Sequence, residues 1–276
     1  MPVSVLILTY NEAINIADCL HSVSWSDDLV VLDSFSTDET VAIARSLNAR
    51  VEQRRFDDYA SQRNYGLQQI EYRHPWVLML DADERVPEDL RAEMEAVVAG
   101  APAELCLLRC RRRDHLLGRW IRRSSGYPTW FGRLVRIGKV YAERPYNEQI
   151  KTDGTAATLR HHLDHYPFNK GFQEWISKHN RYSTMEAEFL HRTGGDAWRW
   201  SDLVARDPGR RRVALKGIVY SMPLRPAMVF AALYFVRGGL LEGRAGLTFC
   251  LLRAWYEFMI DCKYRELTRR VQGLPV

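Results

Sequence analysis

Three carboxylates, Asp81, Asp83 and Glu84, follow a short apolar segment at residues 76–80. The segment reads as a strand buried on both faces, so the carboxylates emerge together at its end. Asp81 and Asp83 lie two residues apart, and an extended turn would direct both at one divalent cation with oxygen ligands. The alternative is a solvated acidic turn before a helix, because Pro87 and the acids after it also suit a helix start. The motif on its own favours that alternative.

Strand and helix patterns alternate through the first 110 residues. Short apolar runs that read as strands occur at residues 3–8, 29–32, 76–80 and 105–108. Segments with apolar residues at helical spacing separate them, which predicts an α/β layer with a mainly parallel sheet flanked by helices. Open sheets of this kind bind ligands beyond the carboxyl ends of their strands. Residues 9–12, Asp33 and residues 81–84 would all lie at that edge.

Composition and missing motifs narrow the classes of function. The chain has 276 residues, a formal net charge of +5 and five cysteines. An odd number of cysteines without Cys-x-x-Cys spacing argues against a disulfide framework or a zinc ribbon and fits a reducing cytoplasm. The start of the sequence lacks the features of a secretory signal. The sequence has no Gly-x-Gly-x-x-Gly motif after its first strand and no Gly-Lys-Ser/Thr loop, which are the glycine-rich motifs that hold phosphates in dinucleotide and P-loop sites. We therefore expect a metal ion to hold any phosphates.

Four motifs resemble, in order and spacing, the nucleotide-sugar half of family 2 glycosyltransferases. They are Leu8–Glu12, Asp33–Asp38, Arg63–Gly66 and Leu80–Glu84. Later stretches resemble the subgroup of bacterial lipopolysaccharide core β-glucosyltransferases, namely Arg133-Leu134, Asn147-Glu148, His165-Tyr166 and residues 178–182. The resemblance covers nearly the whole chain and implies a GT-A fold that binds a UDP-sugar.

The resemblance also assigns roles to residues at the strand ends. The implied nucleotide-sugar contacts are Thr9, Tyr10, Asn11, Glu12, Asp33, Arg63, Asn64, Asp81 and Ala82. Asp33 would recognise uracil through the imide N–H, with a turn-initiating Asp as the alternative. Arg63 would pair with the diphosphate or with Asp81, or form a merely structural salt bridge. Asp81 and Asp83 would hold Mg²⁺ or Mn²⁺ across the diphosphate and neutralise the UDP leaving group.

An inverting transfer needs a base within reach of the acceptor hydroxyl. Glu148 is the predicted base, because it matches the glutamate of the family's usual His-Glu pair, although Asn147 stands in place of the His. A surface glutamate is the alternative reading. Glu143 and Asp114 are the reserve candidates for the base.

Histidines and tryptophans offer further contacts. His161, His162 and His165 crowd one stretch, but without cysteines or a helical His-Glu-x-x-His a zinc site is not expected. His165 matches a position of the subgroup and is predicted to contact the diphosphate or the acceptor. Trp130 and Trp175 would stack on sugar or pack in the core.

Arginines are concentrated between residues 109 and 123, interleaved with Trp120. Such a run suits a solvated face, or an acceptor that carries phosphate or carboxylate, as lipopolysaccharide inner core does. Farther on, the apolar stretches of residues 217–262 are shorter than the roughly 20 residues that span a bilayer. Helices lying in the membrane interface, with Trp255 and Tyr256 at headgroup level, are predicted; a helical packing domain or dimer face is the alternative.

The sequence therefore predicts three parts. Residues 1–110 form the nucleotide-sugar-binding half, residues 111–212 the acceptor-binding and catalytic half, and residues 213–276 a helical C-terminal appendage. The predicted activity is metal-dependent, inverting transfer of glucose from UDP-glucose onto lipopolysaccharide core in a β linkage, by a protein peripheral on the cytoplasmic face of the bacterial inner membrane. The rivals are a transferase for another lipid-linked or capsular glycan and a basic nucleic-acid-binding module. No recognised nucleic-acid motif is present, so a nucleic-acid partner is not expected.

Overall fold

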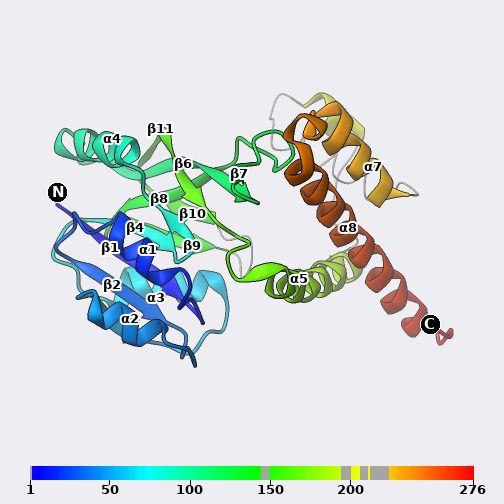
Figure 1. The fold of residues 1–276 in the computed structure, drawn as a ribbon, viewed down its shortest axis with the longest axis horizontal. Helices are drawn as coiled ribbons and strands as arrows, with labels where there is room; N and C mark the ends of the chain where they lie inside the picture. The colour runs from blue at the N-terminus through cyan, green and yellow to red at the C-terminus, as the bar shows by residue number, and fades with distance from the viewer. Residues whose placement is uncertain (1, 144–148, 194–199, 206–210, 212–223) are drawn as a thin grey trace. The chain divides into compact units, whose positions relative to one another are not determined.

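The structure is a computed structural model that describes residues 2–143, 149–193, 200–205, 211 and 224–276. Two compact units make up the chain (Figure 1). The first contains residues 1–122 and 126–170, and the second contains residues 123–125 and 171–276.

A mixed sheet forms the centre of the first unit. Its parallel half consists of β1 (Val3–Thr9), β2 (Leu29–Asp33), β3 (Arg50–Gln53) and β4 (Trp76–Asp81). Its other half consists of β5 (Glu84–Arg85), β6 (Leu105–Leu116), β7 (Arg119–Trp120), β8 (Trp130–Arg136) and β11 (Thr155–His165). Among the described residues the strands follow the order β3-β2-β1-β4-β8-β6-β11-β5, and β7 pairs with β6. The predicted α/β sheet is thus confirmed.

Both faces of this sheet are covered. One face carries the helices α1 (Ile16–Ser22), α2 (Thr40–Ser46) and α4 (Glu88–Ala99), whose buried residues join one hydrophobic cluster. The other face carries α3 (Tyr59–Gln69) and the antiparallel hairpin of β9 (Val140–Glu143) and β10 (Gln149–Thr152), which contribute to a second cluster. Because side chains alternate along a strand, Val5 and Ile7 of β1 join the first cluster and Leu6 joins the second.

Local signals in the sequence account for the placement of α3. Asp58 precedes the helix in an extended conformation, and its side chain accepts a hydrogen bond from the backbone N–H of Ser61 at 2.9 Å. Such an N-cap satisfies a donor that the first turn leaves unpaired. This cap fixes the start of the helix that leads into β4.

Helices make up the second unit. Its elements are α5 (Gly171–Thr193), η1 (Trp200–Val204), α7 (Arg225–Ala231), η2 (Ala232–Val236), η3 (Gly239–Glu242) and α8 (Gly243–Val271). Lys263 of α8 donates to α5 at Asn180 Oδ1 (2.7 Å), Ser183 Oγ (2.8 Å) and Thr184 Oγ1 (2.8 Å). This lysine joins the two long helices, which also share the ring contact of Trp175 with Trp255.

The division of the chain differs from the predicted boundaries at residues 110 and 212. Strand β6 runs without a break from Leu105 to Leu116, across the first predicted boundary. It pairs with β8 and β11, so residues up to 170 belong to the same sheet unit. The helical unit consists of residues 123–125 and 171–276, and in it α5 packs with α8.

Candidate functional site

Asp81, the last residue of β4, is held by two arginines from distant segments. Arg63 Nη2 donates to Asp81 Oδ1 at 2.8 Å, and Arg133 Nη2 donates to Asp81 Oδ2 at 2.7 Å. Burial opposes ionisation, but the charges of Arg133 and Arg63 outweigh it and lower the pKa of Asp81 far below its ordinary value. Arg63 pairs with Asp81 in this structure, and its contact with a diphosphate stays a prediction. Each carboxylate oxygen of Asp81 accepts one arginine bond, and the part of Asp81 in holding a metal ion stays a prediction.

Glu84 completes this arginine cluster from inside the protein. Its side chain is fully buried, accepts from Arg133 Nη2 at 2.6 Å and lies 3.6 Å from Arg112 Nη1. The backbone N–H of Asp81 also donates to Glu84 Oε2 at 3.1 Å. Glu84 therefore positions Arg133, which in turn orients Asp81. The sequence placed Glu84 among the acidic residues but gave no sign of this positioning role.

Removing Arg133 is expected to destabilise the protein strongly. In Arg133→Met the fully buried carboxylate of Glu84 loses its nearest counter-charge, which costs about 3 to 5 kcal/mol of unfolding free energy. Urea unfolding checks this, with Arg91→Met as the control. Arg91 pairs with the exposed Glu88 at 3.3 Å, a bond worth under about 0.5 kcal/mol after solvent screening. Equal losses in the two variants would contradict the positioning role of Glu84.

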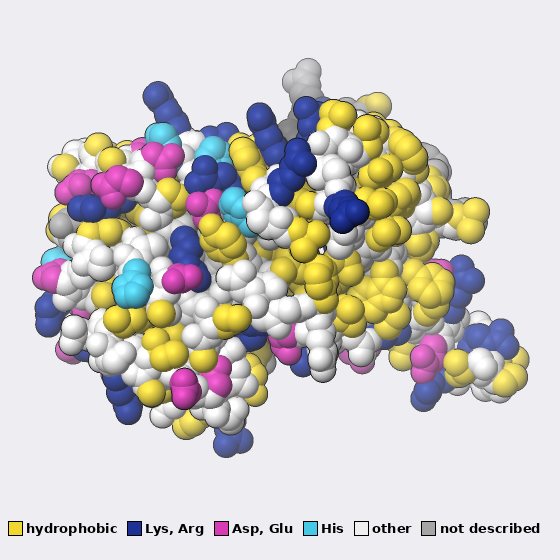
Figure 2. All heavy atoms as spheres, in the orientation of Figure 1, with side chains coloured by type: hydrophobic (Ala, Val, Ile, Leu, Met, Phe, Trp, Pro, Cys, Tyr) yellow, Lys and Arg dark blue, Asp and Glu magenta, His cyan; other side chains and the backbone are white. Residues whose placement is uncertain are grey.

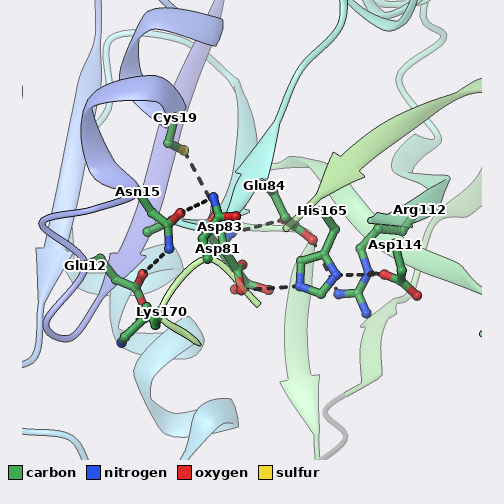
Figure 3. Close-up of polar contacts among 12 residues, drawn as sticks. Glu12, Asn15, Cys19, Asp81, Asp83, Glu84, Arg112, Asp114, His165 and Lys170 are labelled. Carbon is green, nitrogen blue, oxygen red and sulfur yellow. Dashed lines mark hydrogen bonds and ion pairs between the residues drawn. The ribbon is translucent and has the colours of Figure 1, made fainter. Parts of the chain in front are cut away.

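Asp83, His165 and Asp114 form a second chain of contacts at the same edge of the sheet (Figure 3). His165 Nδ1 lies 2.7 Å from Asp114 Oδ1, and His165 Nε2 lies 3.3 Å from Asp83 Oδ2. Burial and the charge of Arg112 disfavour protonation, but Asp83 and Asp114 together raise the pKa of His165 above its ordinary value. Asp114, although buried, has a lowered pKa because His165 and Arg112 donate to it. The imidazole is thus held at both nitrogens.

This arrangement fits a divalent cation that a phosphate chain helps to hold. Asp83 would supply an oxygen and the neutral form of His165 a nitrogen through Nε2, while Asp114 would orient the ring through Nδ1, as carboxylates behind ligating histidines do at metal sites. Within the described ranges no cluster of three or more His, Cys, Asp or Glu side chains is arranged to hold a metal. Two protein donors are nevertheless enough where diphosphate oxygens and water complete the shell, as is common for Mg²⁺. The donor set therefore fits Mg²⁺ or Mn²⁺ at Asp83.

The loops after β1 and β2 are tied together at the neighbouring strand ends. Thr9 Oγ1 donates to Asp33 Oδ1 at 2.9 Å, and the backbone N–H of Ser36 donates to Asp33 Oδ2 at 2.9 Å. Gln53 Nε2 donates to the same Oδ2 at 3.1 Å, and Asp33 is fully buried. An imide N–H would have to displace one of these bonds, so Asp33 organises the loop in this structure. Its contact with uracil stays a prediction.

Asn11 joins the same two loops from the β1 side. Its backbone lies in the left-handed region with φ of 52°, a conformation that Asn tolerates better than most residues. Its Oδ1 accepts from the backbone N–H of Thr37 at 2.8 Å, and its own N–H donates to Ser36 Oγ at 2.8 Å. Next to it, the ring of Tyr10 is 56% exposed at this edge of the sheet. Tyr10 is therefore accessible to a ligand, whereas the amide of Asn11 is engaged with the loop.

Glu12 faces a lysine that the sequence patterns did not single out. Lys170 lies next to Glu12 (Figure 3), and its Nζ donates to Glu12 Oε1 at 3.0 Å. The same Nζ donates to the backbone carbonyl of Tyr10 at 3.1 Å. Burial raises the pKa of Glu12, although Asn15 and Lys170 oppose the shift by bonding to the carboxylate. Lys170 lies 158 residues from Glu12 in the chain, so no local pattern could have placed it here. It adds a cation beside the predicted nucleotide contacts.

Asn64 and Ala82 hold neighbouring parts of the fold. Asn64 Nδ2 donates to the carbonyl of Ala142 at 2.9 Å and its Oδ1 accepts from the N–H of Ala142 at 2.7 Å. These bonds join α3 to strand β9, whereas Ala82 packs in the hydrophobic cluster of the first unit.

The predicted base, Glu148, lies outside the described residues, as do Asn147 and Pro145. The reserve candidate Glu143 is the last residue of β9.

The two candidate sugar-stacking tryptophans differ in exposure. Trp130, at the start of β8, is 40% exposed, whereas Trp175 is only 8% exposed and stacks on His179 with ring centroids 3.6 Å apart. Trp175 therefore packs inside the helical unit, and Trp130 remains available to a ligand. Tyr256 is also a packing residue, because its ring lies 5.4 Å from that of His179.

In the described part of the chain no helix has the length and apolar character needed to cross a membrane.

Comparisons with known proteins agree with this geometry. The lipopolysaccharide core biosynthesis glycosyltransferase LpsC of Rhizobium meliloti is 28% identical to the chain, covering 97% of it and 90% of LpsC. An uncharacterized glycosyltransferase of Rickettsia bellii is 24% identical, covering 96% of the chain and 87% of that protein.

A crystal structure of residues 1–349 of S. aureus TarS aligns with a TM-score of 0.43 at 16% identity, covering 96% of the chain and 92% of that structure. The family model for glycosyl transferase family 2 matches residues 4–166, which are most of the sheet unit with Asp83, Asp114 and His165. The protein therefore belongs to glycosyl transferase family 2, and its sheet unit has the predicted GT-A architecture.

Proposed function

We propose that the protein transfers glucose from UDP-glucose onto a lipopolysaccharide core acceptor and forms a β linkage. The observation that carries the proposal is the meeting of Asp83 and His165 beside the loops that follow β1 and β2. Parallel strands of a nucleotide-binding sheet present their ligands at this edge. The choice of acceptor is supported by LpsC, whose name places it in lipopolysaccharide core biosynthesis.

Asp83 and His165 are the proposed holders of Mg²⁺ or Mn²⁺. The cation would neutralise the charge that builds on the diphosphate as UDP leaves. Arg133 and Arg63 keep Asp81 ionised and fixed beside it. Lys170 places a further positive charge next to Glu12 at the loop after β1. Each of these cations is paired with a carboxylate, so a bound metal ion would supply the main positive charge for a diphosphate at the end of β4.

The proposed transfer is a single displacement at the anomeric carbon of glucose. An acceptor hydroxyl oxygen forms the new bond to that carbon while the bond to the β-phosphate oxygen breaks, and UDP leaves with the bonding electron pair. Attack from the side opposite to UDP inverts the configuration and gives the β linkage. The hydroxyl proton passes to a carboxylate, for which Glu148 is the proposed base.

An anionic membrane surface is the proposed docking partner of the helical unit. Figure 2 shows hydrophobic side chains gathered over α7, η2 and α8. Phe235, Val236 and Leu251 are 61%, 85% and 53% exposed, and Arg237 and Arg253 are exposed beside them. Apolar side chains flanked by arginines suit the interface of a bilayer with anionic headgroups. In this proposal the protein is peripheral on the cytoplasmic face of the inner membrane.

Vesicle binding tests this surface. We expect the protein to sediment with vesicles that contain phosphatidylglycerol and to be released by high salt or alkaline carbonate, because arginines and a shallow apolar face provide the attraction. Phe235→Ser with Val236→Ser should reduce the bound fraction several-fold, whereas Val271→Ser, which is exposed at the end of α8, serves as the control. Equal binding to neutral vesicles would contradict the attraction between the arginines and anionic lipid. Protein that stays on the vesicles in alkaline carbonate would contradict peripheral binding.

A transfer assay tests the proposed activity. Purified protein with Mn²⁺ is offered a panel of nucleotide sugars and three acceptor classes: rough-strain lipopolysaccharide, a polyprenyl-linked glycan and a capsular oligosaccharide. We expect UDP release to depend on UDP-glucose together with lipopolysaccharide, and the product to show a β-anomeric proton signal. Transfer only to another acceptor class would reassign the acceptor within the same family. An α-linked product would contradict the inverting mechanism.

A further inference from the structure

Aromatic and basic side chains gather on one face of the sheet away from Asp83. Arg111 of β6 lies over the ring of Trp130, with its Cζ 5.0 Å from the ring centroid, and 6.0 Å from the centroid of Tyr127. Tyr127 Oη is 2.9 Å from His162 Nε2, and the rings of Trp120 and Tyr127 meet edge to face at 5.3 Å. These five residues are called the Arg111 face below. They come from β6, β7, β8, β11 and the segment before β8.

Arg111 differs from its neighbours in having no carboxylate partner. Arg112 pairs with Asp114 at 3.0 Å, and Arg113 pairs with Asp164 at 2.6 Å. Across the described ranges no Asp or Glu oxygen lies within ion-pair distance of Arg111, whose guanidinium instead donates to the carbonyl of Arg160. The charge of Arg111 is thus available to an anion. Burial and the nearby arginines lower the pKa of His162, so the imidazole does not add a second charge near neutral pH.

Two buried N–H donors on the Arg111 face lack acceptors. Among the residues that the structure describes, Trp120 Nε1 and Arg111 Nε are buried donors without a hydrogen-bond partner. An unpaired buried donor costs about 1 to 3 kcal/mol, so such groups are rare without a reason. Both belong to the same cluster, beside a tryptophan ring that is 40% exposed. The protein's own acceptors therefore leave this cluster incomplete, next to a ring that a ligand can reach.

The Arg111 face lies on the same side of the sheet as the β9–β10 hairpin. Side chains alternate along a strand, so Arg109 and Arg111 share a face that excludes Arg112. Arg109 pairs with Gly132, where a Cβ would come within 3.0 Å of Ile150 in β10. The β9–β10 hairpin and the Arg111 face therefore border the same surface. Arg112, Asp114 and His165 point to the opposite face.

We propose that the Arg111 face is the subsite that binds an anionic sugar of the acceptor. Trp130 stacks on the sugar ring, and Arg111 binds a phosphate or carboxylate on it, since both anions accept the forked N–H donors of a guanidinium. The inference rests on the proposed glycosyl transfer and assigns its acceptor chemistry. It also gives a role to Trp130 that the donor site does not require.

Binding of a defined oligosaccharide tests the subsite. The probe is deacylated core oligosaccharide from rough-strain lipopolysaccharide, measured by calorimetry with UDP and Mn²⁺ present. We expect Arg111→Ala and Trp130→Ala each to weaken binding about tenfold or more, while UDP affinity stays within twofold of the parent. Arg91→Ala, which removes an arginine over the ring of Trp25 at 5.9 Å, should leave both affinities unchanged.

Chemical treatment of the probe identifies the anion. If Arg111 recognises a phosphate, dephosphorylated oligosaccharide should bind the parent as weakly as the intact probe binds Arg111→Ala. If Arg111 recognises a carboxylate, carboxyl-reduced oligosaccharide should show that same weak binding to the parent. Parent-like binding by both variants, or no binding of the probe by the parent, would overturn the subsite. If the parent fails to bind UDP with Mn²⁺, the proposed function itself fails. If UDP binds and only the oligosaccharide result is negative, the subsite alone fails.

Discussion

Asp83→Asn is expected to leave a folded protein with about a thousandfold lower turnover and no metal-dependent binding of UDP-glucose. An amide keeps the size of the side chain but removes the charge that would hold the cation beside His165 Nε2, 3.3 Å away. Steady-state kinetics with Mn²⁺ measures the turnover, and calorimetry measures the binding. Folding is checked by urea unfolding of the same preparation.

Asp153→Asn is the matched control, because Asp153 is an exposed aspartate in the turn after β10. Its turnover should equal that of the parent, and parent-like turnover in folded Asp83→Asn would contradict the metal assignment. Asp81→Asn is a less selective test. It would weaken the bonds of Arg63 and Arg133 to this carboxylate, so lost stability would accompany any lost activity.

Glu148→Gln is expected to separate binding from chemistry. Glutamine keeps the size and most of the hydrogen bonding of glutamate but cannot accept the acceptor's proton. UDP-glucose affinity should hardly change, while turnover falls by about two to four orders of magnitude. Calorimetry for the donor and initial rates with a fixed acceptor measure the two quantities independently.

Glu95→Gln is the control for Glu148, since Glu95 is an exposed glutamate of α4 with no assigned role. If turnover in Glu148→Gln stays within a few-fold of the parent, Glu148 is a surface residue and Glu143 becomes the next candidate. Asp114 is a weaker reserve in the structure, because it already accepts from His165 and Arg112. Should Glu148→Gln weaken UDP binding as much as Asp83→Asn does, Glu148 belongs to the donor site instead.

Local sequence patterns predicted the sheet unit well, because its strands and helices obey short-range periodicity. The apolar run at residues 3–8 became β1, Val3–Thr9, and the run before Asp81 became β4. The edge at which ligands were expected follows directly from that alternation. Family resemblance then pointed to His165, which the structure places next to Asp83.

Side-chain partners across long chain separations were not predictable in this way. Asp81 and Arg133 are 52 residues apart, and their pairing depends on β4 and β8 being neighbours in the sheet. Asp33 looked like a ligand-binding residue from its place at a strand end, yet Gln53 and Ser36 enclose it. Arg111 has no carboxylate partner in the described part of the chain, but the sequence shows it only as one of a run of similar arginines. Only the strand register distinguishes it from Arg112 and Arg113.

Thermal unfolding in the presence of UDP-glucose tests the central claim most directly. A ligand that binds only the folded state raises the melting temperature according to its concentration and affinity. We predict that UDP-glucose with Mn²⁺ raises the Tm by several degrees, that EDTA abolishes the rise, and that Asp83→Asn shows none. An equal rise without metal, or no rise with any UDP-sugar, would contradict a metal-dependent UDP-sugar site at Asp83.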